Sequence, residues 1–206
     1  MSSREEVPKV NAGSMADIAF LLLIFFLVTT SIETDAGLNR MLPKESPTPP
    51  LPINQRNILA ILINGENQLM VDGDITPMEE LKELAVAFLD NGGLPVRNEN
   101  YCDYCQGKRD VLSSDNPQKA IVSLMSNRDT SYGVYVTVQN ELVSAYNTLR
   151  NREAQRLYKM DFTTMEEHYM SKETSMESKA VFKDRIQKIQ AMYPMQLSEA
   201  ERKQNQ

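Results

Sequence analysis

Hydrophobic residues are concentrated in one run near the start of the chain, from Ala16 to Ile32. A helix rises about 1.5 Å per residue and a bilayer core is about 30 Å thick, so the run and its flanks predict a transmembrane helix over residues 14–33. A signal peptide and a buried core helix are the alternatives. The acidic residues Glu5 and Glu6 before the run, and the absence of an Ala-x-Ala cleavage motif after it, favour a retained helix.

Charges beside the run do not fix its orientation. Arg4 and Lys9 precede it, while Arg40 and Lys44 follow it, so the positive-inside rule gives no preference. The lengths on the two sides differ greatly, because only a short tail comes before the run and most of the chain comes after it. The sequence therefore predicts a cytoplasmic tail over residues 1–13 and an exported C-terminal part.

Asp17 lies at the beginning of the run, on the same helical face as Leu21, Ile24 and Val28. An ionisable residue within a span is costly and is a functional candidate by default, although a helix cap at headgroup level is the inert alternative. A carboxyl that is partly removed from water favours its neutral form, which allows proton exchange near neutral pH. Further along, the Thr29 hydroxyl either bonds to the preceding turn or supports a proton path.

Beyond the run, the pattern predicts a Pro-rich linker over residues 34–55 and an α+β domain over residues 56–160, with helices on one face of a small sheet. The linker carries five prolines between 43 and 52, which favour an extended spacer, although a PxxP ligand is an alternative. In the domain, Asn64-Gly65 marks a hairpin turn, and Thr76-Pro-Met-Glu79 is typical of a capping box. The expected elements are strands over 57–63, 68–72 and 120–125, and helices over 76–91 and 134–158; the last begins ambiguously because GVYVTV alternates like a strand.

The remaining residues, 161–206, predict a helical extension. Thr174 and Glu177 are spaced as a second capping box, and an apolar stripe follows at helical spacing until Pro194: Phe182, Ile186, Ile189 and Tyr193. The polar face mixes lysine with glutamate, so the stripe is expected to pack on the domain or on a second copy rather than on lipid. Residues 198–206 are expected to fray.

Composition excludes several classes of function. The 206 residues carry a formal net charge of −6, which disfavours nucleic-acid binding. His168 is the only histidine, so a His-based zinc site or a Ser-His-Asp triad is not expected. The sequence contains neither a Walker loop nor a Gly-x-Gly-x-x-Gly fingerprint. We therefore expect that the protein is not an enzyme and that it binds neither a metal nor a cofactor.

Two cysteines, Cys102 and Cys105, lie in an inserted loop over about residues 93–117. A zinc site lacks further ligands, and a thioredoxin-like site lacks the strand before it and the helix after it. A local disulfide that pins the loop is the third interpretation, and an oxidising compartment favours it.

The string DIAFLLLIFFLVTTSI, with an aspartate before a Leu/Ile/Phe run that closes on Val-Thr, resembles the single transmembrane helix of the ExbD/TolR family. The similarity extends more weakly through Leu42-Pro43, the hairpin and the helix after Thr76. The resemblance implies a single-pass inner-membrane protein with a cytoplasmic N-terminus and a periplasmic domain. It also implies that Asp17 is the proton carrier and that Thr29 is the family's hydroxyl residue late in the span.

The resemblance further implies a motor subunit driven by the proton-motive force. Its expected partners are an ExbB-like ring of multi-span subunits, a TonB-like energy transducer and a second copy of this chain. A TolR-like subunit for envelope constriction is one alternative. A passively anchored periplasmic scaffold or binding protein, in which Asp17 is incidental, is another.

Overall fold

The computed structural model describes residues 12–29 and 53–201. They fall into two compact units, residues 1–42 and residues 43–206, and each is described by itself. The first contains helix α1 (Ala12–Thr29). Within the described residues, no helix combines the length and the apolar composition that crossing a membrane requires. Residues 1–11 of the predicted tail over 1–13, the end of the predicted span and most of the predicted linker lie outside these residues.

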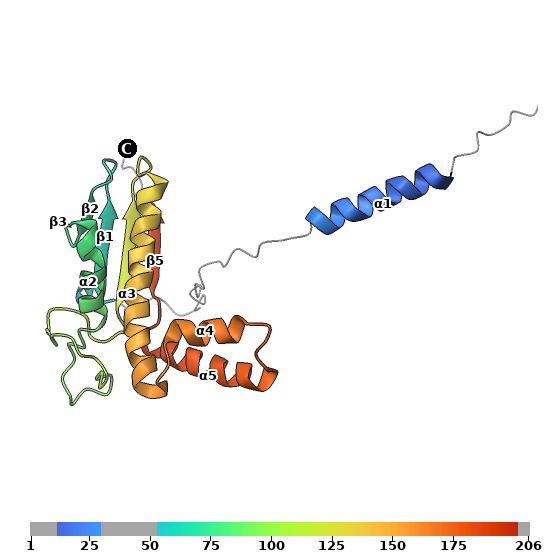
Figure 1. The fold of residues 1–206 in the computed structure, drawn as a ribbon. Helices are drawn as coiled ribbons and strands as arrows, with labels where there is room; N and C mark the ends of the chain where they lie inside the picture. Colours follow the sequence, from blue (N-terminus) through green and yellow to red (C-terminus); the bar gives the residue numbers. More distant parts are fainter. Residues whose placement is uncertain (1–11, 30–52, 202–206) are drawn as a thin grey trace, which may run out of the picture. The chain divides into compact units, whose positions relative to one another are not determined.

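The second unit is an α+β domain with one mixed sheet (Figure 1). Its elements in chain order are η1 (Gln55–Asn57), β1 (Ile58–Ile63), β2 (Leu69–Val71), β3 (Asp74–Ile75), α2 (Met78–Leu89), β4 (Ile121–Ser126), α3 (Tyr132–Tyr158), α4 (Phe162–Met170), α5 (Met176–Met192) and β5 (Leu197–Glu201). The α+β class expected from the sequence is confirmed.

The strands lie in the order β3-β2-β1-β4-β5. β1 and β2 form the predicted antiparallel hairpin, in which Ile61 pairs with Val71. β4 runs parallel to β1, with Leu124 beside Ile61, and β5 runs parallel to β4. The sequence places β1 correctly at the centre of the sheet, because its apolar residues occupy both faces.

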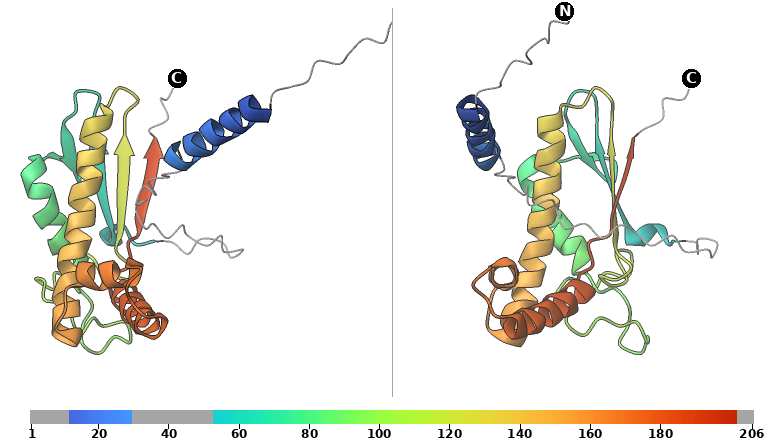
Figure 2. Two further views of the ribbon diagram at one scale, coloured as in Figure 1. Left: turned by 45° about the vertical axis from the view of Figure 1, so that its right-hand side comes forward. Right: turned by 90° about the vertical axis from the view of Figure 1, so that its right-hand side faces the viewer.

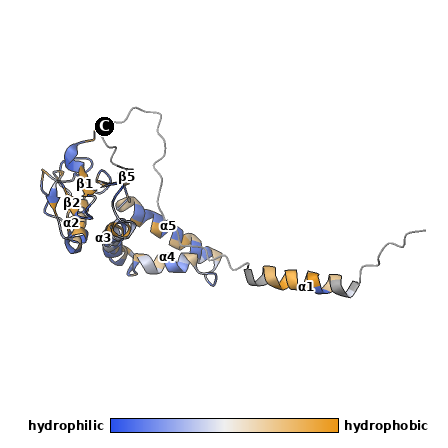
Figure 3. Ribbon diagram, turned by 90° about the horizontal axis from the view of Figure 1, so that it is seen from above, coloured by the Kyte–Doolittle hydropathy of each residue, from blue (hydrophilic) through white to orange (hydrophobic). Residues whose placement is uncertain are grey.

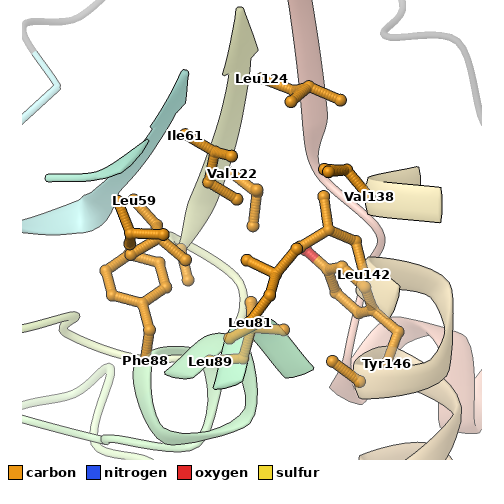
Figure 4. Close-up of a cluster of buried hydrophobic side chains, with 14 of the residues drawn as sticks. Leu59, Ile61, Leu81, Phe88, Leu89, Val122, Leu124, Val138, Leu142 and Tyr146 are labelled. Atoms are coloured by element: carbon orange, nitrogen blue, oxygen red, sulfur yellow. The ribbon is translucent and has the colours of Figure 1, made fainter. Parts of the chain in front are cut away.

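The core lies between one face of the sheet and helices α2 and α3, which cover that face (Figure 2). Residues alternate between buried and half-buried along β1 and most of β4, because successive side chains of a strand point to opposite faces. Leu59, Ile61, Val122 and Leu124 point toward the helices, where they meet Leu81, Phe88, Leu142 and other apolar side chains (Figure 4).

The two predicted capping boxes are wrong in detail. Helix α2 starts after Pro77, and no side chain caps it, because the Thr76 hydroxyl donates instead to the carbonyl of Asp74 at 3.1 Å. In α5 the cap is Ser175 rather than Thr174, and its Oγ accepts from the backbone N–H of Ser178.

The C-terminal part differs most from the expectation. α4 and α5 form a helical hairpin on the end of α3, with a small core of its own: Ala154, Phe162, Met165, Ile186 and Ile189. This confirms that the stripe of α5 packs on the domain. The expected fraying is wrong for residues 198–201, because β5 joins the sheet as an edge strand. Its sequence gives little signal, since only Leu197 is large and apolar and its pairing with β4 uses backbone groups. Residues 202–206 lie outside the described part.

Candidate functional site

The first candidate is Asp17, in the second turn of α1. Leu21 and Ile24 follow it at positions i+4 and i+7, on the same face, as the sequence analysis expected. The side chains from Met15 to Phe26 are all exposed, including every large apolar one, and α1 is coloured as mainly hydrophobic in Figure 3. Among the described residues, Asp17 has neither an ion pair nor a side-chain hydrogen bond.

Thr29 is the last residue of α1. Its side chain and that of Val28 are outside the described side chains. Thr29 follows Asp17 by twelve positions in the helix, which corresponds to about 18 Å along the axis. The helix therefore does not bring the two predicted residues together, and any shared proton path would need groups between them.

The second candidate is the loop between α2 and β4. Cys102 and Cys105 are joined there by a disulfide with an S–S distance of 2.04 Å, and both are buried. The Arg109 guanidinium closes the loop, because it donates to the carbonyls of Cys102 at 3.1 Å and Cys105 at 2.8 Å. It also lies over the ring of Tyr101, 4.7 Å from the centroid. Gly92 has a φ of +62° and leaves no room for a Cβ beside Cys105.

The disulfide loop is attached to the end of α5 through Tyr104. The Tyr104 hydroxyl donates to the carbonyl of Met192 at 2.8 Å and accepts from Gln118 at 2.7 Å. Its ring meets the ring of Tyr193 edge-on, with centroids 5.5 Å apart. Burial raises the pKa of Tyr104 to about 12. The loop is thus fixed to a helix almost ninety positions later in the chain.

Tyr193 also belongs to a buried polar group that we call the Asp90 cluster: Asp90, Arg152, Glu153 and Tyr193. The Tyr193 hydroxyl donates to Asp90 Oδ1 at 2.6 Å and accepts from Arg152 at 2.7 Å. Arg152 reaches both oxygens of Asp90, at 2.6 and 2.8 Å, and contacts Glu153 at 3.2 Å. The cluster therefore ties the end of α2 to α3 and to the end of α5.

The environment of the Asp90 cluster shifts its titrating groups. Burial, and then the hydrogen bond to Asp90, raise the pKa of Tyr193 above its ordinary range. The hydrogen bond to the Asp90 carboxylate raises the pKa of Arg152. Each of these groups is held in the protonation state that the cluster requires. Such a fully paired cluster stabilises the fold rather than releasing protons.

The described residues contain no group of three or more His, Cys, Asp or Glu side chains arranged to hold a metal ion. Of the predicted site residues, the structure joins Cys102 to Cys105 and leaves Asp17 on a separate unit. Sequence analysis missed the Asp90 cluster, because Asp90 looked like the end of a helix and Tyr193 like one more apolar position of a stripe.

The comparison with known families gives a match that covers most of the chain. The family model of the biopolymer transport protein ExbD/TolR matches residues 3–151. The chain belongs to the ExbD/TolR family. The comparison with curated proteins gives no match.

The part that matches the ExbD/TolR family includes α1 with Asp17, the sheet from β1 to β4, the disulfide loop and most of α3. Helices α4 and α5 and strand β5 lie beyond it. The Asp90 cluster crosses this boundary, because Asp90 lies inside the matched range and Tyr193 outside it. The hairpin of α4 and α5 is therefore fixed to the family's domain by polar contacts as well as by its own apolar core.

Proposed function

We propose that this chain is a motor subunit driven by the proton-motive force, within an ExbB/ExbD-like complex that energises TonB-dependent transport across the outer membrane. The observation that carries the proposal is Asp17, a carboxylate without a described partner on an otherwise apolar helix, in a chain of the ExbD/TolR family. The function requires a proton-binding group rather than an enzyme active site.

Residues 14–33 are the proposed single span, with residues 1–13 in the cytoplasm and the folded domain in the periplasm. As a helix, the 20 residues from 14 to 33 would extend over about 30 Å, the thickness of a bilayer core, and α1 includes the first 16 of them. The apolar side chains are exposed on every side of α1, which suits lipid or partner helices better than water.

In the proposed cycle, Asp17 takes up a proton from one side of the membrane and releases it to the other. Each elementary charge that crosses the field contributes about 2.3 kcal/mol per 100 mV, so a few protons can drive a substantial conformational change. Thr29 would support the exit or entry of the proton through intervening water.

An unpartnered carboxylate in hydrocarbon needs polar neighbours, which supports a ring of multi-span, ExbB-like subunits around the helix. The residues of α1 after Gly13 lack a small-xxx-small pattern, which disfavours close pairing of two such helices alone. We propose that two copies of the chain share one ring. The linker over residues 34–55 would then transmit the motion to the periplasmic domain and to a TonB-like transducer.

The experiment compares Asp17→Asn with Asp17→Glu in cells. Asparagine preserves size and polarity but cannot exchange a proton, whereas glutamate retains an ionisable carboxyl. We expect normal amounts of both variants in the membrane, loss of gradient-dependent transport for Asp17→Asn and partial activity for Asp17→Glu. Wild-type transport by Asp17→Asn would favour the passive anchor instead.

The TolR-like alternative requires a second readout in the same strains. A TolR-like subunit would leave outer-membrane uptake intact and impair envelope constriction when Asp17 is replaced. Measuring uptake and constriction together therefore separates the two roles within the family.

A further inference from the structure

A surface cavity of about 470 Å³ lies where strand β3, helix α2 and the disulfide loop meet. Leu59 and Phe88 contribute to its buried wall and lie close together in Figure 4. Ile75 and Leu84 line its exposed part. Because residues from three separate elements line the cavity, its shape depends on the tertiary fold of the domain and not on one loop alone.

The cavity contains apolar side chains that are exposed and therefore contribute little to the core of the domain. Ile75 is 70% exposed and Leu84 is 40% exposed. On the core-facing side of α2, by contrast, Leu81 and Leu89 are completely buried. Leu84 therefore lies off the core-facing side of the helix, where apolar area remains in water unless another molecule covers it.

Acidic side chains surround this apolar surface. Four carboxylates and one lysine line the cavity: Asp72, Asp74, Glu80, Asp110 and Lys108. Among the residues that the structure describes, none of the four carboxylates forms an ion pair. Asp72 and Asp110 accept backbone N–H groups, whereas the carboxylates of Asp74 and Glu80 are free to bind other donors. The cavity thus has an unbalanced negative charge.

We propose that this cavity binds a linear, basic segment of a partner protein, in which lysine or arginine side chains flank one or two apolar residues. The apolar residues would cover Ile75 and Leu84, and the basic side chains would pair with Asp74 and Glu80. A bound cation is a poorer fit, because within residues 12–29 and 53–201 the carboxylates do not converge into a metal-binding group. The proposal does not depend on proton exchange at Asp17.

The test is fluorescence anisotropy on the full chain in detergent. The probe is a fluorescein-labelled synthetic peptide in which lysines flank a Leu-Pro-Leu centre, and its control has glutamate in place of every lysine. We expect the lysine peptide to bind and the glutamate peptide not to bind. Binding should weaken as salt is raised, because the carboxylates are exposed.

The decisive variant is Asp74→Asn/Glu80→Gln, and the matched control is Glu79→Gln/Glu83→Gln, which removes two exposed carboxylates from the same region without changing the cavity lining. We expect the first pair to weaken binding about three- to tenfold and the control pair to leave it unchanged. Both pairs are exposed, so thermal unfolding should not change.

Three results would overturn the proposal: no binding of the lysine peptide, equal weakening by the control pair, or equal binding of the glutamate peptide. A fourth result would overturn it by assigning the cavity to the chain's own basic residues before the domain. Tighter peptide binding by Arg40→Gln/Lys44→Gln than by the wild type would assign the cavity to those residues and not to a partner.

Discussion

Asp17 and Asp90 are both aspartates of this chain, but the surroundings of their carboxyl groups are opposite. Asp90 is buried and is held by Arg152 and the Tyr193 hydroxyl at 2.6–2.8 Å. Asp17 is exposed on an apolar helix and has no partner among the described residues. Asp90 is thus fixed by side chains from α3 and from the end of α5, whereas no side chain that the structure describes fixes Asp17.

The two aspartates are therefore expected to have different roles: Asp90 stabilises the folded domain, and Asp17 is the proposed proton carrier. The Asp90 cluster joins elements that are far apart in sequence, so its loss should affect folding and leave the chemistry of α1 unchanged. Replacing Asp17 should have the reverse effect. The predictions below test this separation, beginning with the largest effect.

Replacing Asp90 by alanine should destabilise the domain strongly. The Tyr193 hydroxyl would lose its acceptor, and Arg152 would keep only Glu153 as an ion-pair partner. Breaking a buried pair by removing one partner typically costs about 3–5 kcal/mol. Denaturant unfolding measures the loss. The control is Asp17→Asn, which should leave the unfolding of the domain unchanged. Equal stability of Asp90→Ala and the wild type would contradict the structural role of the cluster.

Replacing both cysteines by alanine should cost less. The disulfide closes a short loop, for which the chain-entropy model gives about 2 kcal/mol. Unfolding of Cys102→Ala/Cys105→Ala, compared with the oxidised wild type, measures the effect. Because the cysteines are on a different unit from Asp17, gradient-dependent transport should persist at permissive temperature. Loss of transport in a variant that is folded would contradict the separation of the two regions.

High pH should destabilise the domain gradually. Burial raises the pKa of Tyr104 and Tyr146 to about 12 and also raises the pKa of Tyr193. In the unfolded chain a tyrosine has a pKa of about 10. Above pH of about 10 the unfolded chain therefore loses protons that the folded domain retains, and stability falls as pH rises toward 12. Chemical unfolding between these pH values measures the slope. Tyr146→Phe should make the slope shallower, and an unchanged slope would contradict the assignment.

Much of the fold follows from local patterns in the sequence. The alternation and the Asn64-Gly65 turn predict the β1–β2 hairpin, and helical spacing predicts α2, α3 and α5. β3 and β5 were missed because edge strands are short and are formed by backbone pairing, which has a weak sequence signal. α4 lies within the predicted helical extension, but its bounds were not predicted, because it is short and buries only Phe162 and Met165.

The candidate sites differ in the same way. Asp17 is conspicuous because a single charge interrupts an apolar run, so a local pattern is sufficient to find it. The Asp90 cluster depends on contacts between residues more than a hundred positions apart, such as Asp90 and Tyr193. No spacing rule relates such residues, and only the packing of α2, α3 and α5 brings them together.

Carbodiimide labelling of the complex in native membranes is the most direct test of the central claim. A hydrophobic carbodiimide reacts with a protonated carboxyl in an apolar environment, and mass spectrometry of peptides locates the adduct. The account predicts an adduct on Asp17 that decreases as pH rises, none on Asp90, and loss of gradient-dependent transport in proportion to labelling. An unlabelled Asp17, or a labelled Asp17 with undiminished transport, would contradict the claim that this residue carries the protons.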